Sequence, residues 1–158
     1  MEIVKQVSVF LENKPGRLAQ VLSALARDKV NITALTVMDS HEHSVLRFVT
    51  NDIQRTLQVL NAMNLRHAEA DVISVEMRNQ PGSLAQVCER LAHEHINIDY
   101  AYCSSGGRNG KTVGIFKVAN PEKAGRVLNG ATGVSNRRRL ERRPLRDRRA
   151  YQITGTTR

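Results

Sequence analysis

The sequence predicts an α+β fold built from two copies of one βαββαβ unit, each an antiparallel four-stranded sheet with both helices on one face. The first observation is an internal repeat, in which residues 7–21 recur as residues 73–87, 66 positions later. The second is that both copies pass from a strand-like alternation into a helical stripe through the same Asn-x-Pro-Gly turn. We expect the two sheets to pair side by side, because a lone unit leaves an edge and a face uncovered.

Each element of the first copy has a local signal. Residues 7–11 alternate as a strand does, and residues 13–16 supply the turn. A helix follows from an apolar stripe at i, i+3, i+4 and i+7, formed by Leu18, Val21, Leu22 and Leu25. Residues 32–38 and 45–50 predict a hairpin. Asn51 or Asp52 can cap a second helix, and a final strand at 68–75 runs into the first strand of the second copy.

The second copy repeats these signals. Leu84, Val87, Cys88 and Leu91 reproduce the first helical stripe, and Asn120-Pro121 is a helix start. The order is the ferredoxin-like plan. We therefore expect one unit at residues 1–70, a second at 71–130 and a basic tail at 131–158. The fourth strand of the second unit is in doubt, because residues 137–139, which align with 71–73, are all arginine.

Composition limits the function classes. The 158 residues are 41% hydrophobic and 25% charged, without an apolar run long enough to span a membrane or form a signal peptide, which predicts a cytoplasmic protein. Cys88 and Cys103 cannot build a disulfide framework or a C-x-x-C site. Of the net charge of +9, most lies in residues 131–158, where nine arginines face two acidic residues.

The tail has the charge and the few apolar groups of a disordered segment. One interpretation is an electrostatic arm for nucleic acid or acidic partners. The other is a reading-frame change that replaced the ordinary ending of the second unit, since the repeat stops matching abruptly.

The repeated motifs resemble the ACT domain family of small regulatory modules that bind amino acids. The resemblance rests on residues 10–18 with Val30-Asn31-Ile32, and on residues 79–84 with Ile96-Asn97-Ile98. It implies an effector site at the interface of two paired units, between the first turn and the start of the second strand. By this resemblance the ligand-binding residues are Asn13, Lys14, Pro15, Gly16, Arg17 and Asn31, and in the second copy Asn79, Gln80, Pro81, Gly82, Ser83 and Asn97.

The chemistry of these residues suits a free amino acid. Carboxamides offer both donors and an acceptor, the turn opens a helix N-terminus that favours an anion, and glycine allows close approach to the backbone. A structural alternative is that Asn13 and Asn79 only form Asx turns, while Asn31 and Asn97 end helices in the left-handed conformation. A serine-sensing branch of the family has histidine where Leu11 and Met77 stand, so a branched-chain or aromatic ligand is favoured.

Other candidate motifs lack residues that nucleotide-binding, metal-binding or catalytic sites require. A phosphate-binding loop would need glycine at position 105, where Ser105 stands, and Asn109-Gly110 signals a hairpin turn instead. The pairs His41/His43 and His93/His95 lack the spacing or the partners of a metal site. No nucleophile with a base and no paired carboxylates stand out, so the sequence predicts no enzyme and no cofactor.

The leading hypothesis is therefore a tandem regulatory protein that senses an amino acid between its units and signals to a partner. The alternatives are a regulatory small subunit resembling that of acetolactate synthase, an interaction scaffold, and an RNA-binding module. The last is disfavoured because aromatics are only 4% of the chain. Expected partners are the amino acid, a regulated enzyme and a second copy of the chain, with nucleic acid only through the tail. The identities of the ligand and of the regulated partner stay open.

Overall fold

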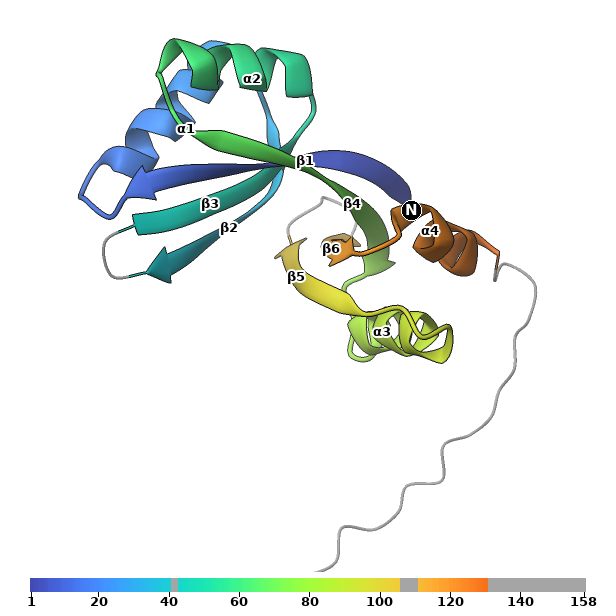
Figure 1. The fold of residues 1–158 in the computed structure, drawn as a ribbon. Helices are drawn as coiled ribbons and strands as arrows, with labels where there is room; N and C mark the ends of the chain where they lie inside the picture. Colours follow the sequence, from blue (N-terminus) through green and yellow to red (C-terminus); the bar gives the residue numbers. More distant parts are fainter. Residues whose placement is uncertain (41–42, 106–110, 131–158) are drawn as a thin grey trace, which may run out of the picture.

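The described part of the chain contains six strands and four helices in the order that the repeat predicts (Figure 1). The computed structural model describes residues 1–40, 43–105 and 111–130. Unit 1 consists of β1 (Glu2–Glu12), α1 (Arg17–Arg27), β2 (Ile32–Ser40), β3 (His43–Thr50), α2 (Ile53–Ala62) and β4 (His67–Arg78). Unit 2 continues from β4 with α3 (Ser83–His93), β5 (Ile98–Ser105), β6 (Lys111–Val118) and α4 (Pro121–Asn129). The predicted α+β class with two βαββαβ units is confirmed.

The helices begin in two different ways. Asp52 caps α2 by accepting the Arg55 N–H at 2.9 Å, and Asn120 caps α4 by accepting the Lys123 N–H at 2.8 Å. In contrast, α1 and α3 start at Gly16 and Gly82, with φ of 87° and 89° and no capping side chain. Glycine adopts this left-handed conformation without strain, so the Pro-Gly turn is kept while the first N–H groups of both helices have no side-chain cap.

The strands form one antiparallel sheet in the order β2-β3-β1-β4-β6-β5. Its centre is the pairing of β1 with β4, which runs from Glu2↔Ser74 to Val9↔His67. Within this register Lys5 pairs with Asp71, its own equivalent in the repeat, and Lys5 Nζ lies 2.8 Å from Asp71 Oδ1. The two units are therefore related by a pseudo-two-fold axis that passes between these side chains.

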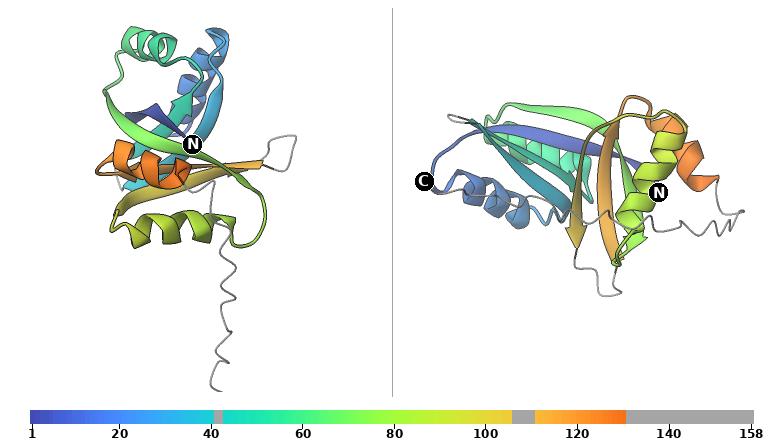
Figure 2. Two further views of the ribbon diagram at one scale, coloured as in Figure 1. Left: turned by 90° about the vertical axis from the view of Figure 1, so that its right-hand side faces the viewer. Right: turned by 90° about the horizontal axis from the view of Figure 1, so that it is seen from below.

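Unit 2 takes its fourth strand from unit 1. On one side β4 pairs with β6, from Ile73↔Phe116 to Arg78↔Lys111, and on the other side it pairs with residues 2–9 of β1. This second position is the one that a strand after α4 holds in a complete βαββαβ unit. The chain start lies beside α4 (Figures 1 and 2), and Met1 Cε is 2.8 Å from the point where a Cβ on Gly125 would stand.

The pairing of β1 with β4 completes a four-stranded sheet for unit 2. β1 occupies the position beside β4 that the doubtful fourth strand of unit 2 would hold. Residues 131–158, with both interpretations of the tail, lie outside the described residues, as do His41 and the Asn109-Gly110 turn.

The apolar residues form three clusters on the two faces of this sheet. One lies beneath α1 and α2 and is centred on Leu46 and Phe48, and a second lies beneath α3 and α4 and is centred on Ile73 and Phe116. The third, with Val72 and Ile115, lies on the face without helices. The edge strands β2 and β5 contact each other, and Figure 2 shows the two halves crossing. The sheet thus curls until its helix-free face closes on itself, with the long β1 and β4 forming the bend.

Four polar side chains, which together we call the seam cluster, fill the space where the two units meet. It consists of Gln6, Arg47, Tyr100 and Tyr102. Gln6 is fully buried; its Nε2 donates to Tyr100 Oη at 2.8 Å, and its Oε1 accepts from Tyr102 Oη at 3.1 Å. The Arg47 guanidinium lies 4.4 Å from the centroid of the Tyr100 ring. The seam between the units is therefore packed and hydrogen-bonded.

Stability is expected to fall as the pH rises above about 10. Burial, followed by the neighbouring Tyr100, raises the pKa of the Tyr102 hydroxyl above its ordinary value. The unfolded chain then ionises first, so this group contributes stability below the ordinary tyrosine pKa that is lost above it. The hydrogen bond to Asp71 raises the Lys5 pKa, which acts in the same direction. Urea midpoints should decline from about pH 8 to about pH 11, and less steeply in Tyr102→Phe. An equal decline in that variant would contradict the assignment.

Candidate functional site

The first predicted site gathers at the end of β1 in a hollow that we call the turn-1 cleft. Its volume is about 170 Å³, and it is lined by Leu11, Glu12, Asn13, Lys14, Arg17, Leu18, Val37 and Ser44. Three predicted site residues, Asn13, Lys14 and Arg17, thus meet here beside apolar side chains from β1, α1 and β2. Pro15 and Gly16 complete the turn and are exposed. The turn is closed by backbone bonds from Lys14 N–H to the Glu12 carbonyl at 2.8 Å and from Arg17 N–H to the Lys14 carbonyl at 3.3 Å.

Charges of both signs line this cleft. Glu12 Oε2 lies 3.0 Å from Lys14 Nζ and 3.4 Å from Arg17 Nη2. The hydrogen bond from Lys14, with the adjacent charges of Lys14 and Arg17, lowers the pKa of the Glu12 carboxyl. Glu12 therefore remains an anion at any pH near neutrality, next to two cations and the uncapped start of α1.

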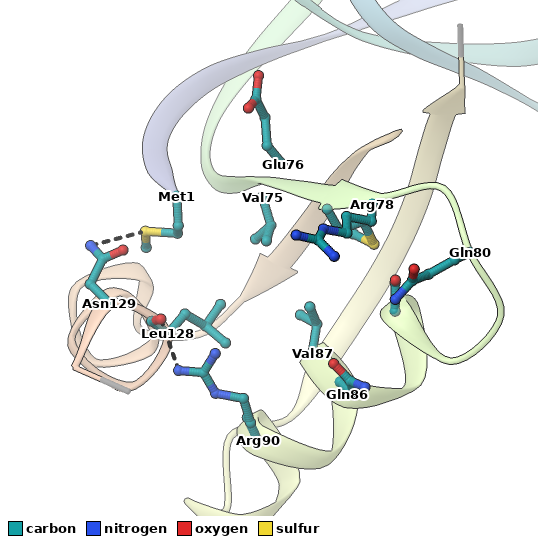
Figure 3. A pocket seen from close by; sticks show the side chains of 12 residues that line it. Met1, Val75, Glu76, Arg78, Gln80, Gln86, Val87, Arg90, Leu128 and Asn129 are labelled. Carbon is teal, nitrogen blue, oxygen red and sulfur yellow. Dashed lines mark hydrogen bonds between the residues drawn. The ribbon is translucent and has the colours of Figure 1, made fainter. Parts of the chain in front are cut away.

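The second predicted site lies at the end of β4 and borders a larger hollow, which we call the unit-2 cavity (Figure 3). Gln80 and Ser83 line it, whereas Asn79, Pro81 and Gly82 form the exposed turn. Its volume is about 460 Å³, and its other lining residues are Met1, Val75, Glu76, Met77, Arg78, Gln86, Val87, Arg90, Leu128 and Asn129. The turn itself repeats the first, with Ser83 N–H donating to the Gln80 carbonyl at 3.3 Å.

Asn31 and Asn97 lie away from both hollows. The Asn31 N–H donates to Asn51 Oδ1 at 2.9 Å, and its carbonyl accepts the Asn51 N–H at 3.1 Å, which ties the start of β2 to the end of β3. Asn97 Nδ2 donates to Asp99 Oδ1 at 3.1 Å. The idea that these asparagines end the helices in the left-handed conformation is wrong, because Lys29 and His95, two residues earlier, have the positive φ.

The structure does not bring the two predicted turns together within one chain. β1 and β4 run antiparallel and pair through residues 2–9 and 67–74, so each turn follows the strand end that points away from the other unit. The seam cluster occupies the space between the units instead. Within this chain the turn-1 cleft and the unit-2 cavity are therefore separate sites.

Sequence reasoning missed two kinds of residue. Glu12 and Arg78 occupy equivalent positions before the two turns and carry opposite charges, so the two hollows differ in electrostatics. The signal was available as a mismatch between otherwise similar repeats. Gln6 could have been noticed through the same kind of mismatch, because its repeat equivalent is Val72. At this buried position a polar residue in one repeat replaces an apolar residue in the other.

The described residues offer little for metal or thiol chemistry. Across residues 1–40, 43–105 and 111–130, no three His, Cys, Asp or Glu side chains are grouped to hold a metal ion. Cys88 and Cys103 are both free, and burial raises the pKa of the Cys103 thiol, which disfavours the reactive thiolate. None of the four helices in the described part has the length and apolar character that crossing a bilayer requires.

Comparison with known proteins gives one family. A family model described as an ACT domain pair matches residues 1–132. No curated protein matches the chain. Protein BT0572 from Bacteroides thetaiotaomicron is 30% identical, with a TM-score of 0.74 over 81% of this chain and 88% of that one.

Regulatory subunits share the fold at lower identity. The ligand-free regulatory subunit of aspartate kinase from Thermus thermophilus is 16% identical, with a TM-score of 0.61 over 82% of this chain and 93% of that one. The corresponding subunit from Thermus flavus is 17% identical, with a TM-score of 0.57 and the same coverage. The family match, which spans both units, agrees with the resemblance that the repeated turns indicated: the chain belongs to the ACT domain pair family.

Proposed function

We propose that this chain is a regulatory protein that binds a free amino acid in the turn-1 cleft and passes its occupancy to another protein. The observation that carries the proposal is the composition of this cleft. It places Asn13, Lys14 and Arg17 beside Glu12 at the uncapped start of α1. The family and the regulatory subunits that share the fold support the same class of function.

The turn-1 cleft offers a partner for each part of a zwitterion. Arg17, Lys14 and the first N–H groups of α1 suit the ligand carboxylate, and Glu12 suits the ammonium group. Leu11, Leu18 and Val37 provide an apolar wall for a branched or aromatic side chain. Charges of both signs in one small hollow favour an amino acid over a simple anion or cation.

A second copy of the chain could complete this cleft. β2 is an edge strand that exposes Leu35, Val37 and Met38 at 40%, 45% and 48%, and Val37 also lines the cleft. Antiparallel pairing with β2 of a second copy would place the start of that strand near the end of this one. Asn31 of the second copy would then reach the turn-1 cleft. Binding would favour the paired state, which is a way to signal occupancy.

The aromatic residues argue against RNA binding. Two of the strand aromatics, Phe48 on β3 and Phe116 on β6, are fully buried beneath the helices. Two others, Tyr100 and Tyr102 on β5, are held by Gln6 in the seam cluster. Base stacking requires several exposed rings on a sheet face, whereas Phe10 on β1 is the one aromatic side chain among the described residues that is largely exposed, at 48%. A regulatory small-molecule protein remains the better-supported class.

A thermal-shift screen against the twenty amino acids tests the proposal. A ligand at a hundredfold excess over its Kd should stabilise the protein by about 2.7 kcal/mol. We expect the largest shift from a branched-chain or aromatic amino acid. Arg17→Gln should weaken its binding about 10- to 100-fold in calorimetry, because a charge-assisted hydrogen bond to the carboxylate is lost.

Arg27→Gln is the matched control, since it removes the same charge from the last turn of the same helix, outside the cleft. It should leave the affinity unchanged. Asn31→Ala should weaken binding only together with a loss of ligand-induced dimers in light scattering. Absence of any shift would favour the scaffold alternative, and equal binding by Arg17→Gln would remove the turn-1 cleft as the site.

A further inference from the structure

The two units differ in the sequence that follows their last helices. In unit 1, Met63 and Leu65 follow α2 and pack against the first core cluster. From β6 onward the repeat offset is 68, as Leu60/Leu128 shows. Met63 and Leu65 then align with Ala131, whose side chain is only a methyl group, and with Gly133, which has no side chain. The sequence of unit 2 thus lacks the side chains that fill the equivalent space in unit 1.

The cavity has an apolar floor and a polar rim. Val75 from β4, Val87 from α3, Leu128 from α4 and Met1 from the chain start form the floor (Figure 3). Met77 from β4 also lines the cavity. Gln80, Gln86 and Asn129 stand on the rim with two arginines. A volume of about 460 Å³ lies within the range of small-molecule sites.

The charged side chains at the cavity indicate which class of ligand it can bind. Arg90 is committed to the end of α4, where its Nη2 donates to the carbonyls of Val127 and Leu128 at 2.7 and 2.8 Å. The Arg78 guanidinium makes no hydrogen bond or ion pair with any residue in the described ranges, and the side chain borders the cavity. Glu76 is paired with Lys111 at 2.6 Å, and Figure 3 shows its carboxylate pointing away from α3 and α4.

We propose that the unit-2 cavity binds a small aliphatic monocarboxylate, with its carboxylate on Arg78 and its chain on the apolar floor. The Gln80 and Gln86 amides can donate further hydrogen bonds to the same carboxylate. An amino acid is disfavoured here, because Glu76, the carboxylate among the lining residues, points away from α3 and α4 and leaves no partner there for an ammonium group. The site differs in this respect from the turn-1 cleft, where Glu12 stands at the position equivalent to Arg78.

The test uses the full chain with hexanoate and 4-methylpentanoate as probes. Leucine is the comparison, since it carries the branched chain of 4-methylpentanoate and adds an ammonium group. Both acids should raise the melting temperature and bind in calorimetry. Arg78→Gln should weaken them about 10- to 100-fold, as expected for loss of a charge-assisted bond. Arg66→Gln, an exposed arginine before β4, is the control and should bind as the wild type does.

A second variant blocks the space rather than the charge. Gln86→Phe places a ring on the exposed rim of α3 and should abolish binding of both acids without lowering the melting temperature of the free protein. Unchanged affinity in Arg78→Gln and Gln86→Phe would overturn the proposal, as would failure of both acids to bind. Leucine binding that is lost in Arg78→Gln would overturn the ligand class. Arg17→Gln reports separately on the turn-1 cleft and should not change hexanoate binding.

Discussion

Removing Met1–Val4 is expected to destabilise unit 2 although no residue of that unit is changed. These residues form the outer part of the fourth strand of unit 2, where Glu2, Ile3 and Val4 pair with Ser74, Ile73 and Val72. The Val4 side chain also packs on the third apolar cluster. Lost backbone hydrogen bonds and lost apolar burial together should cost about 3–6 kcal/mol. This is a large share of the 5–15 kcal/mol by which a domain is typically stable.

Hydrogen exchange measured residue by residue checks this expectation. Amides of α3, α4 and β6 should lose protection in the shortened chain, not only those of unit 1. Deletion of residues 131–158 is the matched control, because the position beside β4 is already filled by β1. That deletion should leave the protection of α3 and α4 unchanged. The opposite pattern, with the tail deletion harmful and the N-terminal deletion silent in unit 2, would refute the shared strand.

The elements of the fold could be predicted because their signals are local. The helical stripes, the Pro-Gly turns and the capping residues Asp52 and Asn120 each act within a few positions of the chain, and the structure places helices and caps where they indicate. The repeat then fixed the order of elements for both units. In contrast, the pairing of residues 2–9 with 67–74 joins segments far apart in sequence, and no local pattern specifies that partner.

Gly125 is a residue whose type is explained by this long-range arrangement. Its equivalent in unit 1 at the offset of 68 is Leu57, whose side chain packs on the first core cluster. In unit 2 the missing side chain makes room for Met1, which packs on the second cluster instead. The reason for glycine at this position is evident only once β1 is known to reach α4, so it could not be predicted from the sequence alone.

The candidate site was predicted in part for the same reason. Residues 13–17 and 80–83 are placed by their own turns, which are local, and five of these residues line the two hollows. Whether the turns meet depends on the direction in which β1 and β4 pair, and their antiparallel register separates them. The opposite charges of Glu12 and Arg78 distinguish the hollows, and they became informative once both residues were known to line them.

Gln6→Leu is expected to have the other large effect, a loss of about 2–4 kcal/mol in the free energy of unfolding. The amide of this fully buried side chain is the partner of the Tyr100 and Tyr102 hydroxyls across the seam. Leucine has a similar size, so the main cost is not an empty space. It is the burial of phenol groups whose hydrogen-bond partner has been removed, at about 1–3 kcal/mol for each group left unsatisfied. Urea unfolding should measure the loss directly.

A triple variant separates this cause from a simple loss of contacts. Gln6→Leu combined with Tyr100→Phe and Tyr102→Phe removes every polar group of the pairings, so no buried hydroxyl lacks a partner. We expect the triple variant to be more stable than Gln6→Leu alone, because replacing all partners by apolar groups can be nearly neutral. A triple variant that loses the sum of the single effects would show that the three residues act independently. Ser8→Ala, which removes only the 3.3 Å contact to Gln6 Nε2, should change stability by about 1 kcal/mol or less.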